Sequence, residues 1–400
     1  MRGVRLLALV AVFTLQLIAV ARADAATPTT FQGGLMGTST ATADKPQSKL
    51  WYHGGSWWAL MNGQVDRDIH IHRLAADHTW VQTGPEVDSR KSYGDVLVDG
   101  NTLYVLSRRT GAGGTRLIRF TYNPVSGGYQ KSPGYPVLVI TAVTETVTIA
   151  KDSTGVLWAT YTAKDSVGVP KVWVTHSTGS SDNTWVPPFQ LPAADTAVSA
   201  DDIAAVVALD GKIGVMWSNQ VSDTFRFVTH VDGAPPNQWG PTETALAGKN
   251  MADDHINLKK ADDGRLFAAV KTSTGRAPLP RIMLLVRGTD GTWSSHVHST
   301  RGDAMTRPMV LLDESHDQVF LFAATSEGAG SQIFYKTTSM NAPGFGPGKG
   351  DPFVTWPGTT LINATSTKQP VDAASGVVVL TGDRAAVRYY HGELPLVGGP

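Results

Sequence analysis

The sequence predicts an all-β chain folded as a seven-bladed β-propeller, with the last blade closed by the N-terminal segment. Three observations lead to this prediction. Turns followed by apolar strands recur seven times along the chain. A turn leading into an aromatic residue follows downstream in most units, with spacings of 49 to 56 residues. Strand alternation supports the assignment, and no helical period competes with it.

Each unit begins at a turn centre that directly precedes an apolar strand. The turn centres are Gly55 before SWWALM, Gly100 before NTLYVLS, Gly155 before VLWATY, Gly211 before KIGVMWS, Gly264 before RLFAAVK, Asp317 before QVFLFAA and Gly376 before VVVLTG. The downstream aromatic positions are Trp80, Tyr129, Trp185, Trp239, Trp293 and Phe345. Four short strands in such a period are typical of a propeller blade, because each blade buries its faces only against its neighbours. We therefore expect the repeated tryptophans to pack between blades.

The seventh unit lacks room for a fourth strand. Its strands are expected over 370–374, 377–380 and 386–390, after which the sequence offers no outer strand. An open sheet edge is a liability that closure removes. We predict that the segment from Phe31 to Met36 pairs with the last blade. The alternative is two unrelated sandwiches joined near Thr196, but regular spacing across that boundary favours one ring.

The N-terminus has the pattern of a secretory signal. Arg2 and Arg5 precede an apolar run from Leu6 to Ala21, and small residues end at Ala23. This run is too short to span a bilayer, and no later segment is long enough. The predicted organisation is a signal peptide over 1–23, an N-terminal segment with the closing strand over 24–46, and the propeller over 47–400. The expected location is extracellular.

Composition restricts the partners. The formal net charge is zero and 17% of residues are charged, so there is no electrostatic footprint for nucleic acid or an anionic membrane. Cysteine is absent, so the core alone must hold an exported fold. A chain of this length can bury enough surface to do so.

Polar residues at the start of each inner strand are the candidates for a functional site. The inner strand of a blade runs away from the mouth of the ring, so its first residues line a central funnel. Counting nine or ten residues back from the turn centres gives one ring of positions, namely Arg90, Lys91, Glu145, Asp202, Asp254 and Arg307. Loops between second and third strands add Arg108 and Asn219. Such a mixed ring suits an oriented ligand, although acidic residues before strands are also common turn formers.

The triplet Asp253, Asp254 and His255 is the most polar part of this ring. We expect Asp254 and His255 both to reach the funnel rim through the first turn of the strand, with Arg307 as the nearest cationic partner. Two chemistries are open. Carboxylates drawn from Glu145, Asp202 and Asp254 could act as an acid and base pair.

Alternatively, His255 could abstract a proton while Arg307 or Arg90 neutralises a uronate carboxylate. Arg90, Arg108, Arg307 and Asn219 are the predicted substrate-binding residues. The histidine pairs His70/His72 and His296/His298 each share a strand face, but both lie on expected outer strands and are assigned to packing or exposure. We predict no metal and no other cofactor.

The turns before the aromatic residues resemble shortened Asp-boxes of the sialidase-type (BNR) propeller superfamily. The segments SSDNTW, ending at Trp185, and GTDGTW, ending at Trp293, keep the Asp, Thr and Trp of that motif between third and fourth strands. The chain lacks the Arg-Ile-Pro segment and the arginine triad of sialidases. The resemblance therefore implies an extracellular propeller that handles glycans, without implying sialidase activity.

Two classes of function follow from these residues. One is a polysaccharide-degrading enzyme, a glycoside hydrolase or a polysaccharide lyase, acting in the funnel on an extracellular oligo- or polysaccharide. The other is a non-catalytic carbohydrate-binding or scaffold propeller. Fold analogy does not decide between them.

Overall fold

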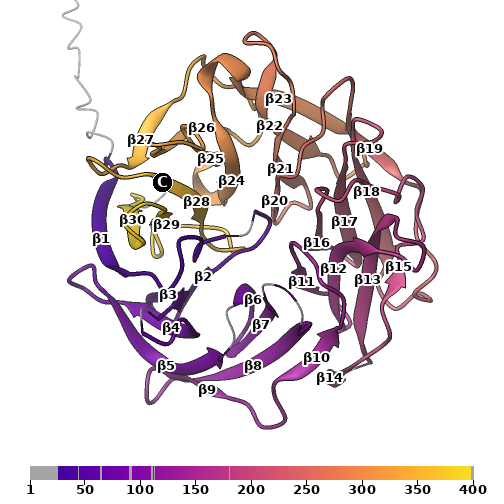
Figure 1. Ribbon diagram of the computed structural model, residues 1–400, viewed down its shortest axis with the longest axis horizontal. Helices are drawn as coiled ribbons and strands as arrows, with labels where there is room; N and C mark the ends of the chain where they lie inside the picture. Colours follow the sequence, from indigo (N-terminus) through magenta and orange to yellow (C-terminus); the bar gives the residue numbers. More distant parts are fainter. Residues whose placement is uncertain are drawn as a thin grey trace, which may run out of the picture.

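The computed structural model describes residues 26–43, 45–63, 65–89, 92–109, 111, 113–179 and 181–397. In these residues seven antiparallel sheets stand around one central axis (Figure 1). The predicted seven-bladed β-propeller is confirmed. Its short 3-10 turns are η1 (Arg301–Asp303) and η2 (Glu314–His316). Within the described residues, no helix has the length and apolar character needed to cross a membrane.

The first three blades run outward from the axis in chain order. Blade 1 comprises β2 (Leu50–His53), β3 (Ser56–Asn62), β4 (Ile69–Leu74) and β5 (Trp80–Asp88). Blade 2 comprises β6 (Ser92–Asp99), β7 (Thr102–Arg109), β8 (Thr115–Asn123) and β10 (Val137–Ile140), with β9 (Gly128–Lys131) also paired to β8. Blade 3 comprises β11 (Thr148–Lys151), β12 (Leu157–Lys164), β13 (Pro170–Thr178) and β14 (Ser181–Trp185), with β15 (Phe189–Gln190) also paired to β13.

The next three blades keep four strands each in the same order. Blade 4 comprises β16 (Ala204–Leu209), β17 (Lys212–Asn219), β18 (Thr224–Val231) and β19 (Glu243–Ala247). Blade 5 comprises β20 (Ile256–Lys260), β21 (Leu266–Lys271), β22 (Pro280–Arg287) and β23 (Trp293–Thr300). Blade 6 comprises β24 (Thr306–Asp313), β25 (Gln318–Ala324), β26 (Ile333–Ser339) and β27 (Asp351–Val354).

Blade 7 joins the two ends of the described chain, as predicted. Its sheet order is β28 (Leu361–Thr365), β29 (Val377–Asp383), β30 (Arg388–Leu394) and β1 (Thr29–Leu35). Figure 1 shows the indigo β1 beside the yellow strands of this blade. After β1, the chain packs tightly against β29, because a Cβ on Gly382 would lie 2.7 Å from the Met36 sulfur. The N-terminal strand thus supplies the outer strand that the C-terminal part lacks.

The expected position of the inner strand of blade 7 is wrong. The inner strand was expected over 370–374, but the inner strand is β28, and the residues from 366 to 376 connect it to β29. The other six inner strands are followed by shorter connections. Counting back a fixed number of residues from Gly376 therefore falls inside the connection. The other two expected strands, over 377–380 and 386–390, correspond to β29 and β30, which pair with each other.

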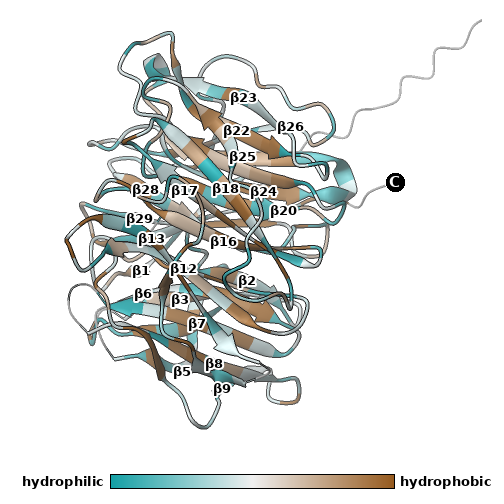
Figure 2. Cartoon of the chain, turned by 90° about the vertical axis from the view of Figure 1, so that its right-hand side faces the viewer, coloured by the Kyte–Doolittle hydropathy of each residue, from teal (hydrophilic) through white to brown (hydrophobic). Residues whose placement is uncertain are grey.

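The apolar core lies between neighbouring blades. Each cluster of buried side chains draws on adjacent sheets, as Trp58 of blade 1 does with Val96 of blade 2. In side view, apolar residues follow the strands (Figure 2). The expected role of the tryptophans is confirmed at Trp293, whose indole donates to Glu243 of blade 4 at 2.8 Å and packs edge-on against Phe227. Stacking of blades therefore buries both faces of each sheet.

The Asp-box-like turns have a simple local cause. In the turn before Trp293, the Asp290 carboxylate accepts hydrogen bonds from the backbone N–H and the hydroxyl of Thr292, at 3.0 and 2.7 Å. Asp77 and Thr79 repeat this arrangement before Trp80. An aspartate that bonds to the backbone two residues on stabilises a turn. The motif thus stabilises the turn that leads into an outer strand at the periphery of the ring. This turn is far along the chain from the funnel residues.

Candidate functional site

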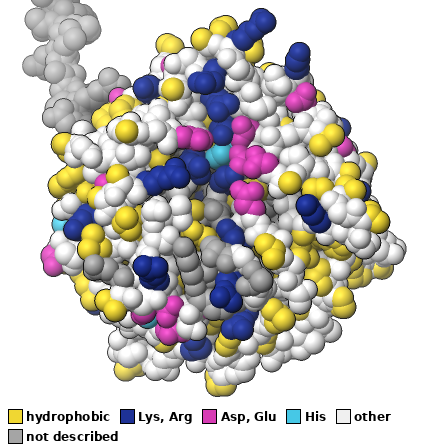
Figure 3. Space-filling model, viewed as in Figure 1, with side chains coloured by type: hydrophobic (Ala, Val, Ile, Leu, Met, Phe, Trp, Pro, Cys, Tyr) yellow, Lys and Arg dark blue, Asp and Glu magenta, His cyan; other side chains and the backbone are white. Residues whose placement is uncertain are grey.

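Charged side chains gather at the centre of one face of the ring. Figure 3 shows acidic and basic side chains around a histidine at this position. The predicted positions Glu145 and Asp254 lie three and two residues before inner strands β11 and β20, and Arg307 lies at the start of β24. The carboxylate oxygens of Glu145, Asp201 and Asp254 lie within 4.8 Å of one another. The predicted funnel therefore brings residues of three blades together.

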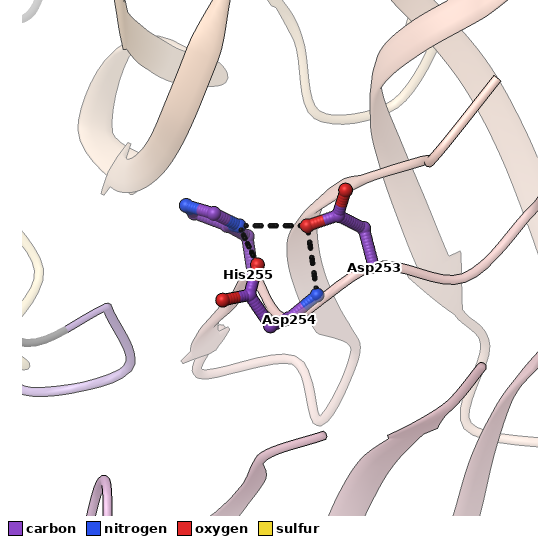
Figure 4. Close-up of side chains that lie close together, drawn as sticks. All are labelled: Asp253, Asp254 and His255. Atoms are coloured by element: carbon purple, nitrogen blue, oxygen red, sulfur yellow. Dashed lines mark hydrogen bonds and ion pairs between the residues drawn. The ribbon is translucent and has the colours of Figure 1, made fainter. Parts of the chain in front are cut away.

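The Asp253, Asp254 and His255 triplet forms a turn, because β20 begins only at Ile256. The His255 N–H donates to the Asp253 carbonyl at 2.9 Å, and the Asp254 N–H donates to the Asp253 carboxylate at 2.8 Å. This turn frees the three side chains from strand alternation. Figure 4 shows both carboxylates turned toward the imidazole. His255 Nδ1 lies 2.6 Å from Asp254 Oδ1 and 3.1 Å from Asp253 Oδ1.

His255 is held as a neutral imidazole. Burial is the main cause that lowers the pKa of His255, to about 3, and the charges of Lys271 and Lys45 act in the same direction. With two carboxylates as acceptors, the proton of the neutral ring belongs on Nδ1. Nε2 then carries a lone pair, and it has no hydrogen-bond partner among the described residues. The ring is therefore oriented through Nδ1 and keeps a lone pair on Nε2, and its low pKa makes it a weak base.

The expectation that His255 is a rim residue is wrong. Its side chain is only 3% exposed. The cavity in front of it measures about 10 Å³, room for one water at most, and Lys45, Arg307 and Asn363 also line it. The turn reaches the axis as predicted, but the side chain lies below the surface of the funnel.

Two lysines, neither of them predicted, neutralise the carboxylates around His255. Lys45, from the segment between β1 and β2, contacts Asp254 and lies 2.9 Å from Glu145. Lys271, at the end of β21, lies 3.1 Å from Asp253 and 3.6 Å from Glu327. Arg307 is therefore not the nearest cation to the triplet, contrary to our expectation.

These contacts favour the ionised form of the acids. Although burial opposes ionisation of Asp253, hydrogen bonds from His255 and Lys271 and their charges hold its pKa below the usual value. Burial likewise opposes ionisation of Glu327, but the Thr306 hydroxyl and the charges of Lys271 and Arg307 lower its pKa. The site is thus a connected network of fixed charges from four parts of the ring.

Arg307 is aimed by an unusual backbone. It has φ = 54°, a left-handed conformation rare for a residue with a side chain, and it lies where the pairing of β24 with β25 shifts register. Asn363 in β28 has φ = 56° at a similar irregularity, and its carboxamide oxygen accepts from Arg307 Nη1 at 2.7 Å. Bulges commonly re-aim side chains next to functional sites. Such strain persists only where the surroundings enforce it, and here it turns Arg307 toward the cavity of His255.

Two predicted site residues support blade 4 instead. Asp202 is fully buried and accepts from the Ser199 N–H at 2.7 Å and the Ser218 hydroxyl at 2.8 Å. The Asn219 side chain is also fully buried and donates to the Asp195 carboxylate and the Ala197 carbonyl, both at 2.9 Å. Neither side chain has capacity left for a ligand. Asp201, one residue earlier than the counted position, is the exposed acid that joins Glu145 and Asp254.

Arg108 and Glu145 share a separate open pocket beside the funnel. Its volume is about 600 Å³, and Thr144, Thr162 and Lys164 also line it. The Arg108 guanidinium stacks over the Tyr93 ring, 5.0 Å from its centroid. A pocket of this size accommodates a sugar residue with room for its neighbours. Arg90, the remaining predicted ligand-binding residue, lies outside the described residues, as does Lys91.

Two groups of donor atoms have the spacing of a metal site. They are the set Asp253, Asp254 and His255 and the set Glu145, Asp201 and Asp254. In both, lysine ammonium groups already contact the carboxylates. The chain itself therefore supplies positive charge to Glu145, Asp253 and Asp254.

No family model matches the chain, and the search of curated proteins found no match. Solved structures similar to it include the polysaccharide lyase Uly1, with 10% identity, a TM-score of 0.48, and coverage of 88% of this chain and 90% of that one. A protein of unknown function from Dyadobacter fermentans has 13% identity, a TM-score of 0.46, and coverage of 74% and 94%. A Hadza microbial sialidase has 14% identity, a TM-score of 0.44, and coverage of 74% and 66%. These likenesses concern the fold.

Proposed function

We propose that this chain is an exported glycan-active propeller that performs proton-transfer chemistry on a carboxylate-bearing polysaccharide at the His255 site. The observation that supports it best is the neutral imidazole held through Nδ1 by two carboxylates, with Nε2 unpartnered among the described residues. The residues that predict export, 1–23, lie outside the described residues, so secretion is part of the proposal.

The reaction that suits this arrangement is β-elimination. In a uronate, the base removes the proton from the carbon next to the carboxylate, and the glycosidic oxygen leaves the adjacent carbon. The products are an unsaturated sugar end and a new hydroxyl end, whose proton comes from water or from the imidazolium. His255 Nε2 would accept the first proton, and the charges of Arg307 and Lys45 would stabilise the enolate-like intermediate.

The same geometry argues against a carboxylate pair as the catalytic groups. A glycoside hydrolase needs one carboxyl group that is protonated and can donate to the leaving oxygen. Glu145 and Asp254 both contact the Lys45 ammonium, and a carboxylate in an ion pair is a poor proton donor. Elimination is therefore favoured over hydrolysis.

The burial of His255 favours a second candidate, binding without chemistry. The cavity at His255 measures about 10 Å³ and is too small for a sugar, whereas the pocket at Arg108 and Glu145 measures about 600 Å³. In this alternative the charge network holds the ring together, and the pocket binds the glycan.

The experiment compares the wild-type protein with His255→Gln on polygalacturonate, alginate, hyaluronan and neutral xylan. Glutamine can still donate to the Asp253 and Asp254 carboxylates but cannot act as a base. We expect ultraviolet absorbance from unsaturated ends with at least one uronate polymer, and a loss of at least 100-fold in rate in the variant. His296→Gln, on the outer strand β23, is the matched control.

Each other outcome contradicts a defined part of the proposal. New reducing ends without absorbance would indicate hydrolysis. Saturable binding without any product would support the binding propeller. Neither binding nor product with any polymer would refute a glycan function.

A further inference from the structure

The central channel contains a second candidate site that the proposed function does not use. Inner strands run from the funnel toward the opposite face, and the residues that follow the funnel positions line a pocket of about 280 Å³. Its walls include Ile149 of β11 and Val206 of β16. Lys259 of β20 also lines it, although only 3% of this residue is exposed. The pocket is thus apolar with a buried cation.

Lys259 has no carboxylate partner among the residues described. Its ammonium lies 3.5 Å from the Asn257 carboxamide oxygen, at the limit of a hydrogen bond. That oxygen already accepts from the Val310 N–H at 3.1 Å. An ammonium has three donors, and a buried one that lacks acceptors is costly.

Asp95 of blade 2 is the acid whose negative charge favours the protonated form of Lys259. Asp95 accepts from the Ser48 N–H and the Ile149 N–H, each at 2.9 Å, and from Lys368 Nζ at 2.6 Å. Lys368 therefore neutralises the Asp95 carboxylate, whose oxygens already accept three hydrogen bonds. Lys368 also lines the pocket, so two ammonium groups share the channel with one neutralised acid.

The other charged groups at this pocket are paired or peripheral. Lys151 binds Asp99 at 2.5 Å, and Lys260 binds Asp210 at 2.6 Å. Asp262 lines the pocket as an exposed residue of the turn after β20. Among the described residues that line this pocket, Lys259 is thus the cation that has no ion pair with a carboxylate.

We propose that the channel binds a small organic carboxylate, with its charge on Lys259 and its carbon skeleton against the apolar walls. The volume exceeds the need of one inorganic ion, since a water molecule takes about 30 Å³ of liquid. Apolar walls with few convergent polar groups are typical of small-molecule sites. The site is separate from the funnel and does not depend on its chemistry.

The charge on Lys259 connects binding to pH. Burial, followed by the charge of Lys368, lowers the pKa of Lys259 to about 7. Without a ligand the amine is therefore largely neutral at pH 8 and charged at pH 6. An anion binds the charged form, so affinity falls as the pH rises, by about tenfold between pH 6 and pH 8.

The test is isothermal titration calorimetry of the whole protein with butyrate, inorganic phosphate and chloride. We expect saturable binding of butyrate at pH 6, about tenfold weaker at pH 8. In Lys259→Met, which replaces the buried cation by an apolar side chain of similar length, butyrate binding should weaken at least tenfold. Lys212→Met, at an exposed position of β17, is the control and should bind as the parent does.

Three results would overturn the proposal. The first is that no probe binds saturably to the wild-type protein. The second is binding of phosphate but not butyrate, which would exclude an organic carboxylate. The third is unchanged butyrate affinity in Lys259→Met. If that variant does not fold, the pH series on the wild-type protein decides, since equal affinity at pH 6 and pH 8 contradicts a site built on Lys259.

Discussion

Replacing Lys45 by Met tests whether this lysine holds the centre of the funnel together. Its ammonium contacts Asp254 and lies 2.9 Å from Glu145. The Lys45 side chain is 11% exposed, and Met fills a similar volume. The substitution therefore removes a charge with little loss of packing. We expect the protein to be less stable near neutral pH.

The magnitude follows from the distance between the two carboxylates. Oxygens of Glu145 and Asp254 lie within 4.8 Å of each other. Two unit charges at that separation repel by about 3.5 kcal/mol at an effective dielectric constant of ~20. Because 36% of the Glu145 side chain is exposed, water screens part of this repulsion. We expect the free energy of unfolding to fall by about 1–2 kcal/mol.

The loss should depend on pH with a definite sign. Repulsion requires that both carboxylates are ionised, so the loss is present near pH 7 and disappears in acid, where carboxylates are protonated. Calorimetric melting of the parent and Lys45→Met at pH 7 and at about pH 3 measures it. Lys45→Arg retains the charge and should retain most of the stability, and Lys212→Met controls for the loss of a lysine elsewhere.

Two results would refute the reasoning. If Lys45→Met melts with the parent at pH 7, the lysine does not neutralise the pair. If the loss is equal at both pH values, it comes from packing and not from charge.

Two further predictions concern the ring itself. Removing residues 26–35, which include β1, should expose the edge of β30 and cause aggregation, measured by light scattering; a truncated protein that melts like the parent would contradict closure by β1. Asp182→Ala should lower the free energy of unfolding by about 2 kcal/mol, because it leaves the Tyr104 and Tyr135 hydroxyls and the Arg119 guanidinium without their shared acceptor. Burial opposes ionisation of Asp182, but these three donors lower its pKa, so its contribution should be present above about pH 4 and lost as the pH falls through the lowered pKa, as melting of parent and variant across pH 2–7 would show.

The fold was predictable because each unit repeats a local signal. A turn and an apolar strand recur, and Thr292 and Asp290 show why the turn marker precedes an outer strand. Closure by β1 could be predicted from the missing strand of the last unit. The inner strand of blade 7 could not, because its connection to β29 is longer than in the other blades and a fixed count does not detect that.

The site was predictable only to the level of the ring. Glu145, Asp254 and Arg307 could be found from their positions along the inner strands. In blade 4 the same count gives Asp202, which is buried, whereas the exposed acid at the funnel is its neighbour Asp201. The position of Lys45 in the funnel could not be predicted from the repeats. This lysine precedes the first complete unit and belongs to the N-terminal segment. Lys271 ends an apolar strand, and only the tertiary structure places it against Asp253.

Closure of the ring by β1 also sets the order in which the molecule can be completed. Thr29 pairs with Glu393, nearly the whole described chain away, so β1 pairs only after β30, the last described strand, has been synthesised. Contacts of such long sequence separation slow folding, and an unpaired strand is exposed to wrong partners meanwhile. Lys45 follows β1 in the sequence, so the segment that closes the ring also brings this lysine to the carboxylates of the funnel. A molecule whose ring is still open therefore has an unfinished site, and ligand binding at the funnel would report on completion of the fold.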